Sequence, residues 1–257
     1  MIALISPAKT MLSATEIISS GKKIEPTEPR FLNQTNSIIS KMLPYSTEEL
    51  KTIFKISPSI AKELKERFAT FFDSNQLSVA AVESYDGVVY KHFKLKVGYS
   101  LKQSDYLQKN VRISSLLYGL LRPFDAIKPY RMEGFVRLSY SDERVDMFWR
   151  DYQTQTLIED VKCSGGELIY LASKEEQRAF HWKEVRKAVR VIDIQFLQYK
   201  GDKLRQVVIY TKMARGEMIK YMVENGIENS EELKKFEWSG YTFNDELSSE
   251  DIWVWTF

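Results

Sequence analysis

Charged side chains of both signs are concentrated in residues 117–133, a block that also contains two prolines. It reads Leu-Tyr-Gly-Leu-Leu-Arg-Pro-Phe-Asp-Ala-Ile-Lys-Pro-Tyr-Arg-Met-Glu. A loop stiffened by proline can hold charges in place, and the planar guanidinium groups of Arg122 and Arg131 suit phosphate or carboxylate. Glu133 could serve as a general acid or base. An alternative of equal weight is that Arg122 pairs with Asp125, and Arg131 with Glu133, as structural ion pairs.

A second candidate site follows the apolar run at residues 2–5, which predicts a buried strand. The next residues are Ser6-Pro7-Ala8-Lys9. A loop just past the carboxyl end of a strand is a common ligand position in α/β proteins. Lys9 there could hold a phosphate as a point charge, or act as a base if desolvated. The glycines of a P-loop are absent, and the alternative is an ordinary surface lysine.

A third candidate is the segment Lys212-Met213-Ala214-Arg215-Gly216. We expect it to open a helix directly after a strand that ends near Tyr210. Free amides at a helix N-terminus attract anions, and two cations placed there oppose the helix dipole unless an anion is bound. Lys212 and Arg215 are therefore predicted anion ligands, and Gly216 would permit close approach of a ligand or strand.

Two consecutive helices are predicted in residues 46–72, joined by a short turn. Ser46 and Glu49 form a capping-box pattern, and Ser57 precedes a proline at the first position of the second helix. The layout loosely resembles a helix-hairpin-helix element, which binds the DNA backbone through hairpin amides and nearby lysines. The predicted DNA contacts are Lys55, Ser57, Lys62 and Lys65. The usual hairpin glycines are missing, so an ordinary helical hairpin is the favoured alternative on these residues alone.

Composition limits the remaining possibilities. The 257 residues are 44% hydrophobic and 28% charged, which is typical of a soluble globular protein. One cysteine, Cys163, and two histidines leave no internal disulfide and no cluster for zinc or iron–sulfur binding, so we expect no metal centre and no cofactor. Neither a membrane span nor a signal peptide is recognisable, which favours a cytoplasmic protein without a membrane partner.

The order of elements predicts an α/β fold (mixed α+β), with one domain over residues 1–257, a mixed sheet, surrounding helices and the helical hairpin at 46–72 as a subdomain. Strands are expected at 2–5, 77–82, 111–121, 167–171, 189–198, 203–210 and 251–257. Helices are expected at 31–43, 46–55, 57–72, 104–109, 146–161, 214–224 and 230–236. Residues 13–30 are expected to form a loop, and 88–95 fit a strand or a helix.

Several motifs, in order, resemble the YaaA family of bacterial peroxide stress response proteins. They are Ser6-Pro7-Ala8-Lys9-Thr10, residues 117–123, Pro129-Tyr130-Arg131-Met132-Glu133, Phe148-Trp149, Leu171-Ala172-Ser173 and Ala214-Arg215-Gly216. Three positions depart from the family pattern: Tyr170 stands for an asparagine, Glu176 for a tyrosine and Arg150 for a glycine. The resemblance implies one α/β domain with a helix-hairpin-helix element and a positively charged cleft. By position, that cleft is lined by Ser6, Lys9, Arg122, Arg131, Glu133, Lys212 and Arg215.

The resemblance also implies binding of duplex and branched DNA, and a role in limiting free iron and oxidative DNA damage during hydrogen peroxide stress. Two hypotheses follow. The first is a DNA-binding protein without sequence preference that uses the cleft and the hairpin. The alternative is an enzyme acting on a phosphorylated or nucleotide-like small molecule, with Lys9 and Glu133 as catalytic residues and the arginines as anion ligands. Direct iron sequestration is disfavoured, because the acidic segment 224–251 is predicted to be solvated.

Overall fold

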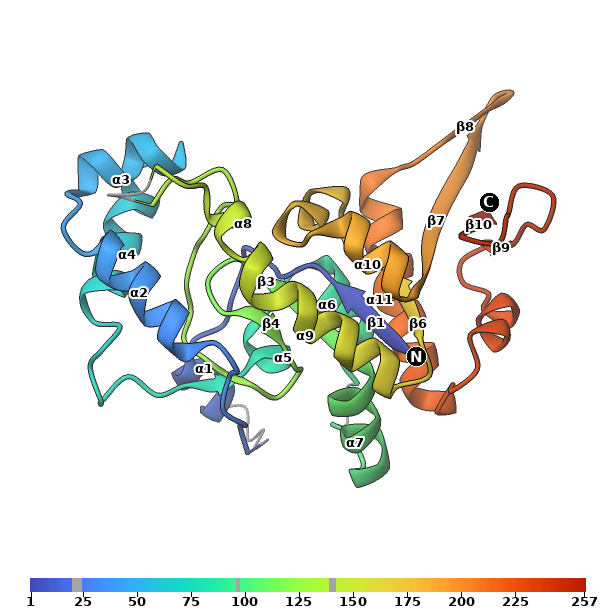
Figure 1. The fold of residues 1–257 in the computed structure, drawn as a ribbon, viewed down its shortest axis with the longest axis horizontal. Coiled ribbons are helices and arrows are strands. Elements are labelled where there is room, and N and C mark those ends of the chain that lie inside the picture. The colour runs from blue at the N-terminus through green and yellow to red at the C-terminus, as the bar shows by residue number, and fades with distance from the viewer. Residues whose placement is uncertain (20–24, 96–97, 139–141) are drawn as a thin grey trace.

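The computed structural model describes residues 1–19, 25–95, 98–138 and 142–257 (Figure 1). Within them, eight strands form one sheet in the order β4-β3-β1-β6-β7-β10-β9, with β8 paired to β7. The strands are β1 (Ile2–Ile5), β3 (Val111–Ser115), β4 (Gly119–Leu121), β6 (Glu167–Tyr170), β7 (Arg190–Lys200), β8 (Lys203–Arg205), β9 (Thr242–Phe243) and β10 (Ile252–Thr256). The predicted fold class, an α/β domain with a mixed sheet, is confirmed.

The centre of the sheet is parallel and its margins are antiparallel. Strand β1 lies between β3 and β6, with Ala3 opposite Val111 on one side and Ile169 on the other. All four residues of β1 are buried, as expected for an inner parallel strand with helices on both faces. Strands β4, β8 and β9 are the antiparallel additions.

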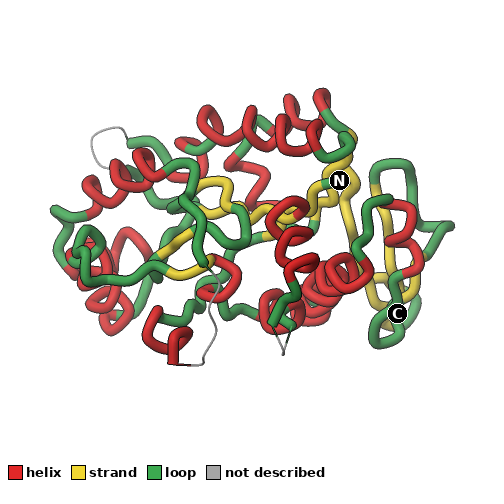
Figure 2. The backbone as a smooth tube through the Cα atoms, turned by 90° about the horizontal axis from the view of Figure 1, so that it is seen from below, coloured by secondary structure: helices red, strands yellow, loops and turns green. Residues whose placement is uncertain are grey.

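Helices cover both faces of this sheet, as the edge-on view in Figure 2 shows. Helices α9 (Arg150–Cys163) and α10 (Trp182–Ala188) pack on one face, and α6 (Val88–Phe93), α7 (Leu101–Asn110) and α11 (Val208–Asn225) on the other. A Cβ at Gly216 in α11 would lie 2.3 Å from the carbonyl oxygen of Val89 in α6. The close approach predicted for this glycine therefore exists, and its partner is a helix.

The predicted helical hairpin lies at one end of the molecule with α2 (Leu32–Met42), on the left of Figure 1. Helix α3 (Thr47–Phe54) begins with the predicted capping box of Ser46 and Glu49, and α4 (Pro58–Ala69) begins with the Ser57 cap and a proline at its first turn. The two helices and their start signals are thus confirmed. A helix-hairpin-helix element is not confirmed, and the standing of 46–72 as a subdomain stays a prediction.

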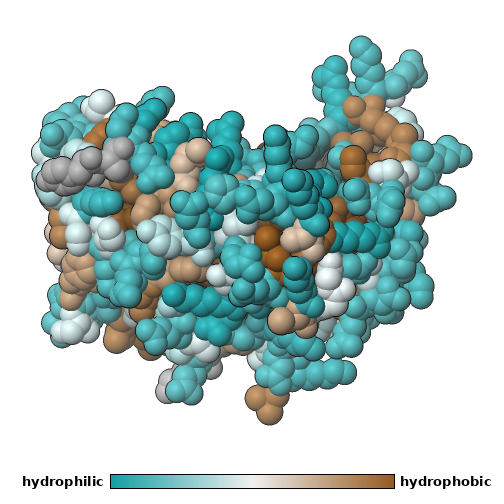
Figure 3. Space-filling model, in the orientation of Figure 1, coloured by the Kyte–Doolittle hydropathy of each residue, from teal (hydrophilic) through white to brown (hydrophobic). Residues whose placement is uncertain are grey.

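At its far end, β7 extends past its neighbours and pairs with β8. The resulting hairpin, residues 198–205, is called the arm, and it projects at the upper right of Figures 1 and 3. The turn of the arm lies between the strands predicted at 189–198 and 203–210, as expected, but the second strand is shorter than predicted. The strand predicted at 203–210 ends at Arg205, and α11 begins at Val208. The β-branched and aromatic residues Val208, Ile209 and Tyr210 favour a strand locally, whereas burial of the following residues in α11 against β7 decides for a helix.

Other element boundaries also differ from expectation. The strand predicted at 111–121 is the antiparallel pair β3 and β4, because the Ser115 hydroxyl accepts hydrogen bonds from the amides of Leu117 and Tyr118 and turns the chain. Helix α1 (Ala14–Ser19) lies in the loop predicted at 13–30, of which 20–24 lie outside the described residues. In place of the strand predicted at 77–82, the chain forms β2 (Val79–Ala80), which pairs with β5 (Ala126–Ile127), and then helix α5 (Ala81–Ser84). The other short elements are α8 (Val145–Phe148), which precedes α9, and the 3-10 helices η1 (Lys174–Ala179) and η2 (Ser230–Lys235).

Candidate functional site

The loops after β1 and β6 diverge at the carboxyl edge of the sheet, because the chain leaves β1 toward β3 and later returns on its other side as β6. Such a switch point opens a crevice in which α/β proteins bind ligands. The Ser6 hydroxyl accepts a 2.9 Å hydrogen bond from the backbone amide of Ser173, and the Tyr90 hydroxyl donates to the Ser6 carbonyl at 2.9 Å. Ser6 therefore joins the two loops, and it is not on the lining of either cavity described below.

The loop that carries Lys9 is held by the segment Tyr85-Asp86-Gly87. The Asp86 amide donates to the carbonyl of Thr10 at 2.9 Å. A Cβ at Gly87 would lie 2.7 Å from the Cβ of Ala8, so only glycine fits beside this loop. The Asp86 side chain pairs with Lys91 at 3.1 Å. The rigid path of the Lys9 loop thus depends on a segment distant in the sequence.

The first cavity, of about 310 Å³, opens between the Lys9 loop, the segment after β5 and the start of η1. It brings together three of the predicted site residues, Lys9, Arg131 and Glu133. The titratable residues that line it are Lys9, Tyr130, Arg131, Glu133, Arg144, Asp146, Glu175, Glu176 and Arg178.

Carboxylates neutralise the central cations of the first cavity. Oε2 of Glu133 lies 2.9 Å from Lys9 Nζ, and Oε1 of Glu133 accepts a hydrogen bond from Arg131 at 2.9 Å. Arg144 pairs in the same way with Asp146. The predicted ion pair between Arg131 and Glu133 is therefore present, and the first cavity is mixed in charge instead of uniformly basic.

Glu176, which departs from the family pattern and was not among the predicted site residues, is a further candidate functional residue. Its side chain lines the first cavity and is 9% exposed, and desolvation raises the pKa of its carboxyl to about 7, although the Ser114 and Ser6 hydroxyls oppose the shift. A carboxyl group that is half protonated near neutral pH can donate or accept a proton. The sequence held a signal for it, a carboxylate just after β6 at the same sheet edge as Ser6.

A buried chain of hydroxyl groups backs the first cavity. The Tyr130 hydroxyl lies 2.7 Å from both the Ser115 hydroxyl and the Tyr85 hydroxyl. Burial raises the pKa of Tyr130 to about 12, so the phenol is neutral under ordinary conditions. These bonds hold the Tyr130 ring, and with it the start of the segment that carries Arg131 and Glu133.

A second cavity, of about 370 Å³, lies beside the inner end of the arm, between the loop after β6, strand β7 and α11. Lys212 and Arg215 both line it, together with Lys174 and Asp193. Because α11 begins at Val208, Lys212 and Arg215 lie one and two turns inside the helix, and the prediction that they flank its N-terminal amides is wrong. The expected single cleft is therefore two cavities, with different cations in each.

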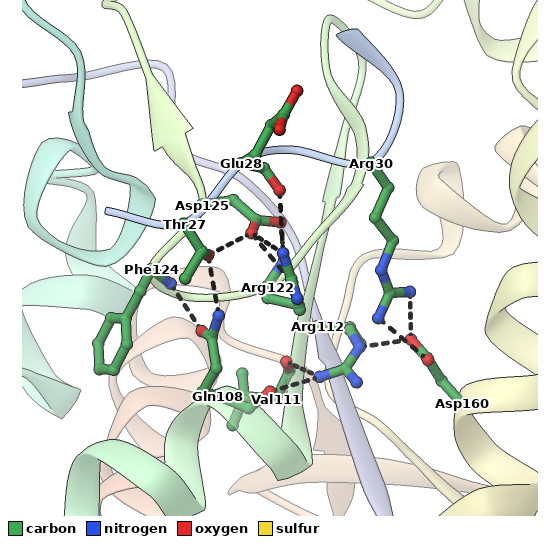
Figure 4. Close-up of polar contacts among 10 residues, drawn as sticks. All are labelled: Thr27, Glu28, Arg30, Gln108, Val111, Arg112, Arg122, Phe124, Asp125 and Asp160. Carbon is green, nitrogen blue, oxygen red and sulfur yellow. Dashed lines mark hydrogen bonds and ion pairs between the residues drawn. The ribbon is translucent and has the colours of Figure 1, made fainter. Parts of the chain in front are cut away.

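Arg122 lines neither cavity. Figure 4 shows its side chain directed at Asp125, whose carboxylate accepts from Arg122 Nε at 3.0 Å and from the Arg122 backbone amide at 2.8 Å. Arg122 Nη2 also donates to the carbonyl of Glu28 at 2.9 Å. Asp125 is fully buried. The structure thus supports the structural ion pair for Arg122, and its predicted place in the anion-binding cleft is corrected.

Three of the four predicted DNA contacts in the hairpin have other interactions. Lys65 Nζ donates to the carbonyl of Leu43 at 2.6 Å, Lys55 Nζ lies 5.3 Å from the centre of an aromatic ring, and the Ser57 hydroxyl caps α4. Lys62 is exposed and has no ion pair in the described parts of the chain. The hairpin therefore offers few unoccupied groups to a phosphate.

Two further features are absent from the part of the chain that the structure describes. No group of three or more His, Cys, Asp or Glu side chains among the described residues could hold a metal ion. None of the described helices combines the length and the apolar character needed to cross a membrane.

Comparison with known proteins places the chain among its relatives. Residues 1–247 match the family model described as peroxide stress protein YaaA. The chain is 40% identical over 257 residues to a UPF0246 protein of Parabacteroides distasonis, covering 99% of this chain and 98% of that one. It is also 40% identical over 257 residues to a UPF0246 protein of Bacteroides fragilis, covering 100% and 98% of the two chains. A UPF0246 protein of Porphyromonas gingivalis is 37% identical over 256 residues, covering 99% and 98%.

Proposed function

Since this chain belongs to the family of peroxide stress protein YaaA, we propose that it acts in the peroxide stress response by binding duplex or branched DNA without sequence preference. We further propose that this binding is linked to limiting free iron and the oxidative damage that iron causes to DNA. A DNA partner would place the protein in the cytoplasm. Contacts to phosphates, which every sequence shares, would supply the affinity.

The observation that carries the proposal is the basic arm. Lys200, Lys203 and Arg205 are exposed, and none of them pairs with a carboxylate among the residues that the structure describes. The arm stands clear of the globular body, with hydrophilic side chains at its tip in Figure 3. Unpaired cations on a projecting hairpin can reach the phosphates of a duplex without a clash between the duplex and the rest of the protein. Tyr199, 58% exposed on the same arm, offers a ring to a sugar or an unpaired base.

Further basic residues lie at the second cavity, next to the arm. Gln206 follows β8 directly and lines that cavity, and the exposed side chains of Lys174 and Lys212 lie on the same lining. If about four phosphates are neutralised, the logarithm of affinity falls with the logarithm of salt concentration with a slope of about −4. In our proposal the arm makes the main contacts, and the hairpin residues Lys55, Ser57, Lys62 and Lys65 make at most secondary ones.

Fluorescence anisotropy with a labelled duplex at several salt concentrations tests the proposal. We expect Lys200→Glu combined with Lys203→Glu to weaken binding at least about tenfold and to make the salt slope shallower by about 2. The matched control is Lys102→Glu combined with Lys109→Glu, the same charge change on α7, at the opposite side of the molecule in Figure 1. A wild-type protein that does not bind at low salt, or equal losses in the two double variants, would contradict the proposal.

The link to iron can be measured with the same variants. Plasmid DNA exposed to ferrous iron and hydrogen peroxide acquires strand breaks, and the wild-type protein is expected to reduce them. The arm double variant should protect less than the α7 control at equal concentration. Equal protection by the arm variant and the α7 control would show that protection against iron does not depend on DNA binding at the arm.

We propose a second candidate function for the first cavity, an enzyme acting on a phosphorylated or nucleotide-like small molecule. The specific observation is that the buried Glu176 carboxyl shares this cavity with the ion pair of Lys9 and Glu133. Glu176 would transfer the proton, while Lys9 and Arg131 would hold the substrate anion. Native mass spectrometry against a set of nucleotides and sugar phosphates tests this. A bound compound that the wild type converts and Glu176→Gln only binds would support it, and the absence of any bound compound would end it.

A further inference from the structure

Arg215 is a partly buried cation that has no counter-ion among the described residues. Its Nε is inaccessible to solvent and has no hydrogen-bond partner, and no carboxylate pairs with its guanidinium among the described residues. Desolvation lowers the pKa of Arg215, and only the nearby Tyr170 hydroxyl opposes this. A desolvated charge without a partner is costly and is uncommon in folded proteins. Arg131 Nε in the first cavity also has no hydrogen-bond partner in the described parts of the chain, but there Glu133 matches the charge.

The surroundings of Arg215 add positive charge. Lys174 and Lys212 line the same cavity, and Asp193 is the acidic residue on its lining. The Asp193 carboxylate already pairs with Arg186, on α10. The charge at the cavity is thus better matched by a ligand with two negative charges than by a single carboxylate. A terminal phosphate has that charge near neutral pH and presents three oxygens to donors.

We propose that the second cavity binds the terminal phosphate of a small molecule, a phosphate monoester, with Arg215 at its base and Lys174 and Lys212 at its rim. The cavity volume of about 370 Å³ accommodates a phosphate and part of a small polar molecule. The side-chain amides of Gln195 and Gln206, also on the lining, are available to that polar part. This site is separate from the first cavity and goes beyond DNA binding by the arm.

Isothermal titration with three probes tests the site: inorganic phosphate, adenosine 5′-monophosphate and adenosine. Both phosphates should bind to the wild-type protein and adenosine should not. Arg215→Met should lower phosphate affinity at least about tenfold, and Lys212→Ala about threefold. The matched control is Arg67→Met, which removes a guanidinium from α4 that pairs with Glu63. Equal phosphate affinity in the wild type and Arg215→Met would overturn the proposal.

Thermal unfolding separates a binding role from a structural one. If Arg215 is present for a ligand, Arg215→Met should melt at the same or a higher temperature than wild type in phosphate-free buffer and lose the stabilisation that added phosphate gives. A lower melting temperature without phosphate, with unchanged stabilisation by phosphate, would assign Arg215 a structural role.

Parallel measurements of DNA binding distinguish the two sources of phosphate, a small-molecule monoester and the DNA backbone. For a duplex without terminal phosphates, Arg215→Met should bind within about twofold of wild type, whereas the double variant of the arm should not. If inorganic phosphate fails to bind while Arg215→Met weakens duplex binding, the cavity takes a backbone phosphate and the monoester proposal is wrong. If phosphate binds to the cavity and DNA does not bind at all, the proposed DNA function fails and the monoester site stands.

Discussion

The ammonium group of Lys9 and the carboxylate of Glu133 form a 2.9 Å ion pair that joins the loop after β1 to the segment after β5. The two partners differ in exposure, with 66% of the Lys9 side chain and 12% of the Glu133 side chain accessible. Glu133 also accepts a hydrogen bond from Arg131. The pair therefore links two loops of the first cavity, and its buried partner serves two cations.

This asymmetry predicts unequal effects of substitution. Glu133→Gln leaves Arg131 without a counter-ion in a partly buried place and should lower the free energy of unfolding by about 2–3 kcal/mol. Lys9→Ala removes an exposed partner and should change it by less than about 1 kcal/mol. Urea unfolding of both variants and of the double variant provides the measurement. Equal losses in the two single variants would show that Lys9 is as important to the fold as Glu133.

Glu176 predicts a pH dependence of stability. Its folded-state pKa of about 7 lies above the ordinary value of 4.5, so the folded protein holds the proton more tightly than the unfolded chain. Its contribution to stability is complete below about pH 4.5 and is lost as the pH rises through 7.

Between pH 5 and pH 8, wild type should therefore lose about 2–3 kcal/mol relative to Glu176→Gln, which cannot ionise. Chemical denaturation of both proteins across this range measures the difference. The idea that Glu176 is protonated in the folded protein fails if the difference is constant with pH.

Gly216 predicts a steric effect. Alanine is the better helix former by about 1 kcal/mol, but its Cβ would lie 2.3 Å from the Val89 carbonyl oxygen and 2.7 Å from the His92 Cβ. Gly216→Ala should therefore destabilise the protein by about 2 kcal/mol or more, because α6 and α11 must separate. Thermal unfolding against Lys220→Ala, a partly exposed position on the same helix, provides the comparison. An unchanged melting temperature would mean that the two helices move apart at little cost.

Substitutions of Asp125 and of Arg122 test whether Arg122 has a structural role. The fully buried carboxylate accepts hydrogen bonds from the Arg122 amide and side chain and from the Thr27 hydroxyl. Asp125→Asn should lower the free energy of unfolding by about 3 kcal/mol, and Arg122→Ala should leave phosphate and DNA affinities within about twofold of wild type. The measurements are urea unfolding and the binding assays described above. A tenfold loss of affinity in Arg122→Ala would return Arg122 to the binding site.

The sequence by itself determined the features that depend on neighbouring residues. The capping box of Ser46 and Glu49, the proline start of α4, the buried strand β1 and the turn of the arm all follow from local backbone preferences and from the spacing of apolar side chains. The family motifs add positions that the fold brings to the carboxyl edge of the sheet. Ser6 and Lys9 are two such positions, since both follow β1.

Tertiary structure decided which of the candidate charges share a cavity. Val208, Ile209 and Tyr210 have strand preferences, but packing of α11 on β7 and α6 makes them helical, which moves Lys212 and Arg215 inside the helix. The expected single cleft became two cavities because Lys9 meets Arg131 and Glu133 from the segment after β5, whereas Lys212 and Arg215, on α11, lie beside β7. The pKa of Glu176 likewise depends on burial by several elements together. Local preference acts over a few residues, whereas burial and charge pairing act through space, and only the assembled fold sets those distances.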